Sequence, residues 1–349
     1  MRIAVLHPQA AFVRGGAEAH AEALVRALRD AGHETDLVQM AWKWFPPAQL
    51  AHNMAIWRSF DITESNGLDV DAVIALKFPS YLVRHERKIV WLLHQHRTAY
   101  DLWDHPEYAD LSRVADGPAI RDMIVHADRT AFSEASRIFT NSKNVAGRLW
   151  DSLRISGEPL YHPSDNMLAL LDADPGSGTD EVLFPSRFEP VKRQSLAIEA
   201  MRHVTASLTL VLVGRGPDEA DLRRLIERYG LVDRVRLEIG VSDEQLRTSF
   251  RRALAVLYPP YDEDYGYVTL EGMAAGRPVV TCTDSGGPLE FVADGETGRV
   301  TAPDPRALAE ALDALHADRA AADRLGAAGR ALVRETVPTW PQVVSRLLA

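Results

Sequence analysis

Residues 258–276 read YPPYDEDYGYVTLEGMAAG and hold two carboxylates, Glu263 and Glu271, separated by seven residues. Gly266 and the apolar segment that begins at Tyr267 predict a strand end, a tight turn and a helix start. The first amides of a helix lack partners within it and lie at the positive end of its dipole, so this terminus is expected to attract phosphate. A helix rises about 1.5 Å per residue, so a separation of eight residues spans roughly 12 Å along a helix. That spacing suits a ligand with a sugar, a diphosphate and a ribose.

Acidic loops before apolar helices are common, so the rest of the chain must support this interpretation. The 349 residues suit two domains, and 46% hydrophobic with 25% charged residues is typical of a soluble globular protein. A net charge of −10 without a long basic run argues against nucleic-acid binding. The single cysteine, Cys282, excludes an intrachain disulfide and is expected to be a buried residue at a strand end. No signal peptide or membrane span of ~18 apolar residues is evident, so we expect a cytoplasmic protein.

Short apolar segments alternate with helical patterns along the first half of the chain. A helix is predicted over residues 17–30, ended by Gly32. The predicted strands are 2–6, 35–39, 71–76, 88–93 and 137–140. This alternation predicts a doubly wound parallel sheet.

The polar segment 172–180 (DADPGSGTD) is the clearest candidate linker, and the same alternation restarts after it. The predicted strands are 181–185, 208–213, 234–239, 255–258 and 278–282, and the predicted helices are 195–203, 219–229, 304–332 and 340–348. The fold is therefore predicted to be α/β, with two such domains and a ligand site in the cleft between them.

Glycines and cations follow several predicted strands. Gly15 and Gly16 let the backbone approach a ligand before a helix, although a simple turn explains them equally well, and the absence of G-x-G-x-x-G disfavours a dehydrogenase. Arg187 and Lys192 in SRFEPVKRQ can neutralise a diphosphate without a metal. Two solvated surface cations are the alternative, and the place of Arg187 at a strand's carboxyl end favours the diphosphate.

The remaining candidates are weaker taken singly. Gly214 permits a tight turn near a ligand, and the backbone at Gly240 and Val241 can pair with a nucleobase edge. His94 ends the strand 88–93 and is preferred over His96 as a substrate contact. No metal is expected, because no carboxylate or third histidine is near in sequence. Asp262-Glu263-Asp264 resembles an Asp-x-Asp metal motif, but with two cations available we interpret Glu263 as the working residue.

Six segments in order cover nearly the whole chain. They are GGAE (15–18), TNSK (140–143), SRFEPVKRQ (186–194), VGRGP (213–217), EDYGYVTLEGMAAGRPVV (263–280) and GGPLEFVADGETG (286–298). This ordered set resembles the retaining glycosyltransferases of family 4 (glycosyl transferases group 1), which have the GT-B fold of two Rossmann-like domains facing across a cleft. The resemblance implies an acceptor-binding domain at 1–165, a nucleotide-sugar-binding domain at 166–335, and a terminal helix at 336–349 that packs back on the first.

The resemblance also implies roles by position. Glu263 would bind donor-sugar hydroxyls and stabilise the oxocarbenium-like transition state, with His94 also on the sugar. Arg187 and Lys192 would bind the departing diphosphate, and Glu271 the ribose hydroxyls. The other donor-binding positions are Gly15, Gly16, Gly214, Gly240, Val241, Gly266, Tyr267 and Val268.

The implied reaction is retaining, metal-independent transfer of a hexose-type sugar from a UDP- or GDP-linked donor to an acceptor hydroxyl, without a cofactor. The acceptor would be a small molecule, a lipid-linked molecule or a glycan. A peripheral membrane contact stays open through Trp42, Trp44, Phe45 and Trp57, but packing or lining of the acceptor site is favoured, because basic residues there are few. An excess of arginine over lysine favours carbohydrate or natural-product biosynthesis. The alternatives are a nucleotide-sugar epimerase of the same fold and a non-catalytic nucleotide-sugar-binding subunit.

The chain departs from the family pattern at three places. Asp264 replaces the small residue that usually follows the first glutamate, and Arg215 stands where an acid is common. The segment His94-Gln95-His96-Arg97 is an uncommon form of the histidine motif, so His96 stays an alternative to His94.

Overall fold

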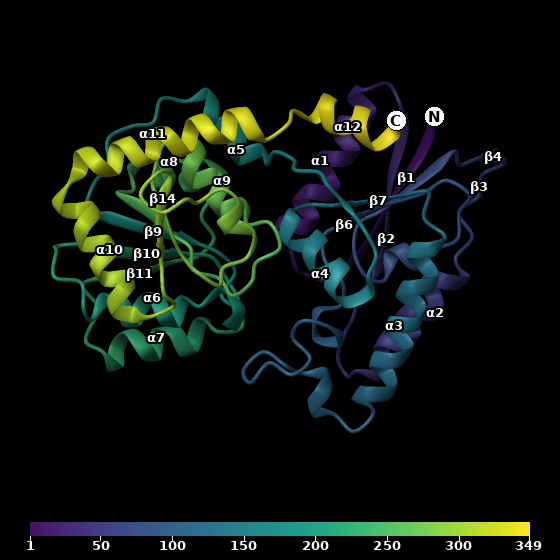
Figure 1. Cartoon of the computed structure of the whole chain (residues 1–349), viewed down its shortest axis with the longest axis horizontal. Helices are drawn as coiled ribbons and strands as arrows, with labels where there is room; N and C mark the ends of the chain where they lie inside the picture. Colours follow the sequence, from purple (N-terminus) through teal and green to yellow (C-terminus); the bar gives the residue numbers. More distant parts are fainter. The chain divides into compact units, whose positions relative to one another are not determined.

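The computed structural model describes residues 1–349, which form two compact units, each built on its own parallel sheet (Figure 1). Unit 1 comprises Met1–His162 and Pro338–Ala349, and unit 2 comprises Pro163–Val337. The prediction of two Rossmann-like, doubly wound domains is confirmed. None of the helices combines the length and the apolar content that crossing a lipid bilayer would require.

Unit 1 has a six-stranded sheet in the order β2-β1-β5-β6-β7-β8. The paired strands are parallel, and their residues are mostly buried, which explains the continuous apolar segments in the sequence. The sheet strands are β1 (Arg2–Gln9), β2 (Glu34–Ala41), β5 (Ala72–Ala75), β6 (Lys88–Leu92), β7 (Arg137–Thr140) and β8 (Glu158–Pro159); β3 (Glu64–Ser65) and β4 (Leu68–Asp69) form a separate hairpin. The helices are α1 (Gly16–Asp30), α2 (Ala48–Ser59), α3 (Gly117–Ser133), α4 (Lys143–Leu153) and α12 (Trp340–Leu348), with 3₁₀ turns η1 (Ser80–Leu82), η2 (Arg97–Ala99) and η3 (Leu111–Arg113).

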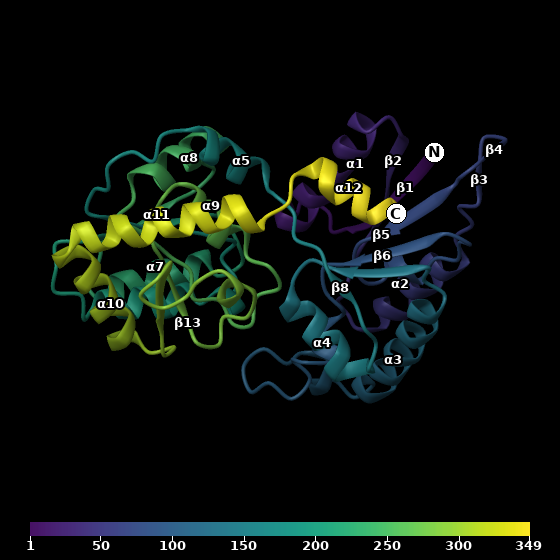
Figure 2. The same ribbon diagram turned by 45° about the horizontal axis from the view of Figure 1, so that its top comes forward.

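The last helix, α12, packs against α1 in unit 1 (Figure 2). Its buried residues Val343, Val344 and Leu347 join the core formed by β1 and α1, which includes Ile3 and Leu24. These residues recur at helical spacing, so one face of α12 is apolar and is removed from water.

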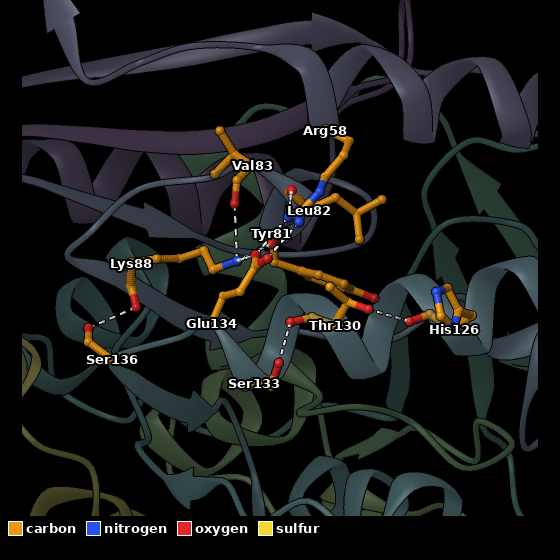
Figure 3. A network of polar contacts seen from close by, with 10 residues as sticks. All are labelled: Arg58, Tyr81, Leu82, Val83, Lys88, His126, Thr130, Ser133, Glu134 and Ser136. Atoms are coloured by element: carbon orange, nitrogen blue, oxygen red, sulfur yellow. Dashed lines mark hydrogen bonds and ion pairs between the residues drawn. The ribbon is translucent and has the colours of Figure 1, made fainter.

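A buried lysine ties the start of β6 to its neighbours (Figure 3). Lys88 Nζ donates to the carbonyls of Tyr81 at 3.2 Å and Val83 at 3.0 Å, and it lies 3.1 Å from the carboxylate of Glu134. Arg58 also pairs with Glu134 through two contacts, of 2.5 and 2.6 Å. The buried ammonium thus has two carbonyl acceptors and a carboxylate partner, which offset part of the cost of burying its charge.

Unit 2 has a six-stranded sheet in the order β11-β10-β9-β12-β13-β14, the doubly wound order of a dinucleotide-binding fold. The strands are β9 (Glu181–Pro185), β10 (Thr209–Val213), β11 (Val235–Glu238), β12 (Ala255–Leu257), β13 (Val279–Cys282) and β14 (Gly298–Thr301). The helices are α5 (Asp165–Asp172), α6 (Gln194–Met201), α7 (Glu219–Arg228), α8 (Asp243–Arg252), α9 (Tyr267–Ala274), α10 (Pro305–Ala317) and α11 (Arg319–Thr336), with 3₁₀ turns η4 (Pro190–Lys192) and η5 (Gly287–Glu290).

Two sequence expectations differ from the structure. The segment 304–332 is helical as predicted, but it forms two helices, α10 and α11, because the chain breaks at Asp318, whose side chain accepts from the amide of Ala321 and caps α11. The predicted linker 172–180 does not join the two units but connects α5 to β9 inside unit 2. Its carbonyls are bound by distant arginines: Arg277 donates to Pro175 O at 2.6 Å and Arg330 to Ala173 O at 2.7 Å.

Candidate active site

The switch point of each sheet is where ligands of doubly wound folds bind, because the loops after the two flanking strands diverge there. In unit 2 it lies between β9 and β12, and in unit 1 between β1 and β5. In unit 2, Lys192 follows β9 and Glu263 follows β12. The Nζ of Lys192 contacts a carboxylate oxygen of Glu263 and lies 3.4 Å from the hydroxyl of Tyr258. Both charged side chains are 17% exposed, so the pair is sheltered but accessible.

The charge state of this pair follows from its surroundings. Burial opposes the charge on Lys192, but the adjacent carboxylate of Glu263 outweighs burial and raises the pKa of the lysine above its ordinary value. Burial, with the charge of Glu263, likewise raises the pKa of Tyr258, which therefore stays a neutral phenol. The unit 2 switch point thus presents a fixed cation, a hydroxyl and a carboxylate.

The loop that carries Glu263 is held on both sides of its backbone. The amide of Glu263 donates to Ser285 O at 2.9 Å, and its carbonyl accepts from the amide of Gly287 at 2.8 Å. Gly266 precedes α9 with φ of +80°, and a side chain there would meet Pro288 at 3.2 Å. Glycine is therefore required for the turn that starts the helix.

Arg193 and Asp284 fasten the two loops that flank the Glu263 loop, and the sequence interpretation missed both. Arg193 donates to the two carboxylate oxygens of Asp284 at 2.8 Å each, and its guanidinium lies 5.0 Å from the ring centre of Tyr261. A bidentate pair of this kind fixes both position and orientation. An arginine beside the predicted Lys192 was visible in the sequence, but its partner, ninety-one positions away, was not.

Glu271 lies in a different environment from Glu263. It is buried on α9, and one of its oxygens accepts from the hydroxyl of Ser164 at 2.9 Å. Burial raises the pKa of Glu271 to about 7, with a further contribution from the charge of Asp243, while the hydrogen bond from Ser164 opposes the rise. Tyr267 and Val268 are the first two residues of α9, and both are half-buried.

The other predicted positions of unit 2 are spread over neighbouring loops. Arg187 pairs with Glu189 at 2.6 Å rather than with Glu263, and its side chain is 39% exposed. Gly214 follows β10, where an added Cβ would lie 1.9 Å from Ser186 O, so only glycine fits. Gly240 and Val241 follow β11.

The switch point of unit 1 also holds a charged cluster. His7 Nε2 lies 3.2 Å from Glu18, Lys77 Nζ lies 3.6 Å from the same oxygen, and the amide of Gly15 donates to the other oxygen at 2.8 Å. Burial opposes ionisation of Glu18, but His7 and Lys77 outweigh it and lower its pKa to about 2. Burial lowers the pKa of His7, and the charge of Lys77 lowers it further, while the hydrogen bond with Glu18 opposes the fall, so His7 stays neutral.

Lys77 and His7 were not among the predicted site residues, and Glu18 was noted only as part of GGAE. Lys77 directly follows the predicted strand 71–76, which is the signal that would have found it. Gly15 and Gly16 lie at the start of α1, as predicted.

The two histidines after β6 differ in environment. His96 packs against Phe78 and Trp42, with ring centres 5.3 and 6.3 Å apart, and burial lowers its pKa to about 4. His94 is half-buried, and its Nδ1 lies 2.7 Å from the carbonyl of Gln95. Because a carbonyl can only accept, Nδ1 of His94 carries the proton and Nε2 does not in the neutral ring.

No group of three or more His, Cys, Asp or Glu side chains in residues 1–349 is arranged to hold a metal ion. Cys282 is buried at the end of β13, and burial raises the pKa of its thiol to about 11, so it is not a nucleophile.

Comparison with known proteins matches residues 174–332 to the family model described as glycosyl transferases group 1. The whole chain is superposable on a sucrose-phosphate synthase from Thermosynechococcus elongatus with a TM-score of 0.77 and 20% identity, covering 99% of this chain and 97% of that one. The structure of Anabaena HepE in complex with UDP and glucose gives a TM-score of 0.70 at 16% identity, covering 100% of this chain and 98% of that one.

The chain has the GT-B fold. Among curated proteins, the phosphatidyl-myo-inositol mannosyltransferase of Mycobacterium leprae is 29% identical over 378 residues, covering 100% of this chain and 96% of the relative. The D-inositol 3-phosphate glycosyltransferase of Streptomyces avermitilis is 34% identical over 160 residues, covering 42% of this chain. The chain spans 34% of the length of that second relative. The family match lies in unit 2, the unit of the GT-B fold that holds the Lys192–Glu263 pair.

Proposed function

We propose that the protein is a glycosyltransferase that uses a nucleotide-sugar donor. The observation that carries the proposal is the Lys192–Glu263 pair at the switch point of unit 2, within the residues matched to glycosyl transferases group 1. A diphosphate needs a cation that stays charged, and a sugar needs carboxylate acceptors for its hydroxyls. Both stand side by side here, on loops after the two strands that flank the switch point.

The finer proposal is a retaining, metal-independent transfer of a hexose from UDP or GDP to an acceptor hydroxyl. Lys192 would exchange Glu263 for the diphosphate and stabilise it as it leaves, with Arg187 released from Glu189 to assist. Glu263 would then bind the sugar and stabilise positive charge at its anomeric carbon. Such preorganised electrostatic stabilisation of developing charge is commonly the largest catalytic contribution.

The nucleotide side is assigned to Glu271. Its carboxylate is fixed by Ser164 through one oxygen, so a defined orientation is available for the ribose hydroxyls. The amides at Gly16, Tyr267 and Val268 would donate to phosphate and sugar, and His94 would contact the sugar. No cofactor is proposed.

The acceptor is proposed to be a small molecule, a lipid-linked molecule or a glycan, in a cytoplasmic pathway of carbohydrate or natural-product biosynthesis. A peripheral membrane contact draws support from Trp44 and Phe45, which are 47% and 68% exposed. Trp57, also considered for this contact, is buried, and Trp42 packs edge-on against Phe78 at 5.7 Å. The epimerase and the non-catalytic subunit are not favoured, because the named relatives are transferases.

Thermal unfolding with UDP, GDP, UDP-glucose and GDP-mannose tests the proposal. A ligand that binds only the folded state at 100 times its Kd stabilises that state by about 2.7 kcal/mol, so one nucleotide series should raise Tm clearly. The nucleotide that raises Tm then identifies the donor series for turnover assays, and NMR of the product reports whether the anomeric configuration is retained. If none of the four compounds changes Tm, the proposed function is contradicted.

A further inference from the structure

A buried carboxylate, Asp128, lies on α3 in unit 1 and has no place in the chemistry proposed above. It is fully buried, and two tyrosines donate to it: Tyr81 Oη to Oδ1 at 3.0 Å and Tyr100 Oη to Oδ2 at 2.8 Å. Burial raises the pKa of Asp128 to about 7, and the hydrogen bonds from the side chains of Tyr100, Tyr81 and Gln95 oppose that rise. Burial disfavours the ionised form of a carboxyl group, so a fully buried aspartate is expected to serve a purpose in the structure.

The two tyrosines connect Asp128 to different parts of unit 1. Tyr81 belongs to η1, its ring stacks on Phe132 with centres 4.9 Å apart, and its carbonyl accepts from buried Lys88 (Figure 3). That side of the carboxylate is therefore anchored in the core. Tyr100 directly follows η2, and its amide donates to Arg97 O at 2.9 Å. That side is attached to the segment that begins at His94.

The segment from His94 to Tyr100 (the histidine segment) is held by further contacts from α3 and α4. The side chain of Gln95 is buried, and its oxygen accepts from the hydroxyl of Ser152 at 3.2 Å. Arg121 on α3 donates to Ala99 O at 2.9 Å. The carbonyl of Gln95, which receives Nδ1–H of His94, thus belongs to a backbone whose position is set from these helices.

We propose that Asp128 is a positioning residue for His94, acting through Tyr100. The carboxylate on α3 fixes the hydroxyl of Tyr100, and thereby the end of the histidine segment. The segment in turn presents the Gln95 carbonyl that orients the His94 ring and keeps its proton on Nδ1. This inference rests on the proposed function only for the role of His94; the positioning itself is a property of unit 1.

Tyr100→Phe and Tyr81→Phe form a matched pair, since each removes one hydroxyl donor from the same carboxylate and keeps the ring. Hydrogen exchange of the amides of residues 95–100 measures the positioning directly, without a substrate. Tyr100→Phe is expected to speed that exchange roughly tenfold, the effect of losing one hydrogen bond. Tyr81→Phe should change it by less than about twofold. Equal exchange rates in the two variants would overturn the proposal.

Turnover supplies the second readout, measured as nucleoside diphosphate released when the sugar of UDP-glucose or, separately, GDP-mannose is transferred to water as the acceptor. Tyr100→Phe is expected to lower kcat about tenfold with donor KM unchanged. A misplaced His94 disturbs the geometry at the reacting sugar and leaves the contacts to the nucleotide in place. A purely structural loss would instead affect Tyr81→Phe equally. Asp128→Asn keeps one acceptor oxygen and should retain more activity than Asp128→Ala.

His94→Ala separates failure of the inference from failure of the proposed function. If His94→Ala keeps full turnover, the proposed role of His94 is wrong, while the exchange difference between the tyrosine variants still supports the positioning. If His94→Ala loses turnover and Tyr100→Phe matches the unaltered protein in both exchange and kcat, the positioning is wrong and the role of His94 stands.

Discussion

The switch points of the two units place a lysine against a glutamate at the same location of the same kind of sheet. In unit 2, Lys192 faces Glu263, which stands on a loop after β12. In unit 1, Lys77 faces Glu18, which stands in the first turn of α1. The two pairs therefore differ in what carries the carboxylate, a loop in one case and a helix in the other.

The surroundings of the two carboxylates differ as well. Glu18 receives the amide of Gly15, the ring of His7 and the ammonium of Lys77, so its charge is compensated by donors from three directions. Glu263 is fixed through backbone hydrogen bonds to Ser285 and Gly287. Its side chain contacts a lysine that can bind a diphosphate in its place. We infer that Glu18 is a structural anion and Glu263 a functional one. The following variants test this contrast.

The largest effect is expected for Glu263→Ala. Removing a preorganised group that stabilises charge in a transition state typically lowers kcat by about 10²–10³-fold. Turnover of the donor selected by thermal unfolding measures this, and circular dichroism with Tm checks that the fold is kept. Activity close to that of the unaltered protein would show that Glu263 has no role in the mechanism and that it does not differ from Glu18 in function.

Glu18→Gln should act on stability instead. The folded pKa of about 2 lies below the ordinary 4.5, so ionised Glu18 stabilises the fold above pH 4.5, and this contribution is lost as the pH falls towards 2. At pH 7 the loss is on the order of 3 kcal/mol in the free energy of unfolding, measured by urea denaturation. The difference in the free energy of unfolding between the variant and the unaltered protein should be smaller at pH 3 than at pH 7. Glu22→Gln, a half-buried position of α1 paired with the exposed Arg14, is the control and should change little at either pH.

Lys192→Met and Lys77→Met compare the two cations. Each substitution keeps a long apolar side chain and removes the charge. Loss of a charged contact worth roughly 1.5–3 kcal/mol should weaken UDP or GDP binding about 10- to 100-fold for Lys192→Met, as measured by calorimetry. Lys77→Met should leave that affinity unchanged. A similar loss in both variants would show that the unit 1 pair also serves the nucleotide.

Arg187→Ala is expected to have the smallest effect. Its guanidinium is already paired with Glu189 and partly exposed, and such pairs contribute about 0.2–1 kcal/mol. Nucleoside-diphosphate affinity should fall only a few-fold in the same calorimetric titration. An unchanged Kd would identify Arg187 as a surface cation, and a tenfold loss would place it beside Lys192 in importance.

The sequence sufficed for the fold because parallel sheets buried on both faces leave long apolar segments, such as 208–213. It also singled out Lys192 and Glu263, each on a loop after a predicted strand, but it did not predict that the two side chains contact one another. Asp128 escaped notice because a charged residue in an amphipathic helix is usually exposed, and only the tertiary fold brings two tyrosines to it. The segment 172–180 was misinterpreted as a linker for a related reason: the arginines that bind its carbonyls lie more than a hundred positions away.

Unit 1 is assembled from two stretches of chain, because α12 returns to it after unit 2 is complete. During synthesis, residues 163–337 have all their own strands available before the ribosome reaches Trp340. Until then, the core around Ile3 and Leu24 lacks Val343, Val344 and Leu347. The apolar surface that these residues cover is exposed to water during that time. Of the two units, unit 1 is therefore begun first and completed last, and the surface that α12 covers stays open until that helix is made.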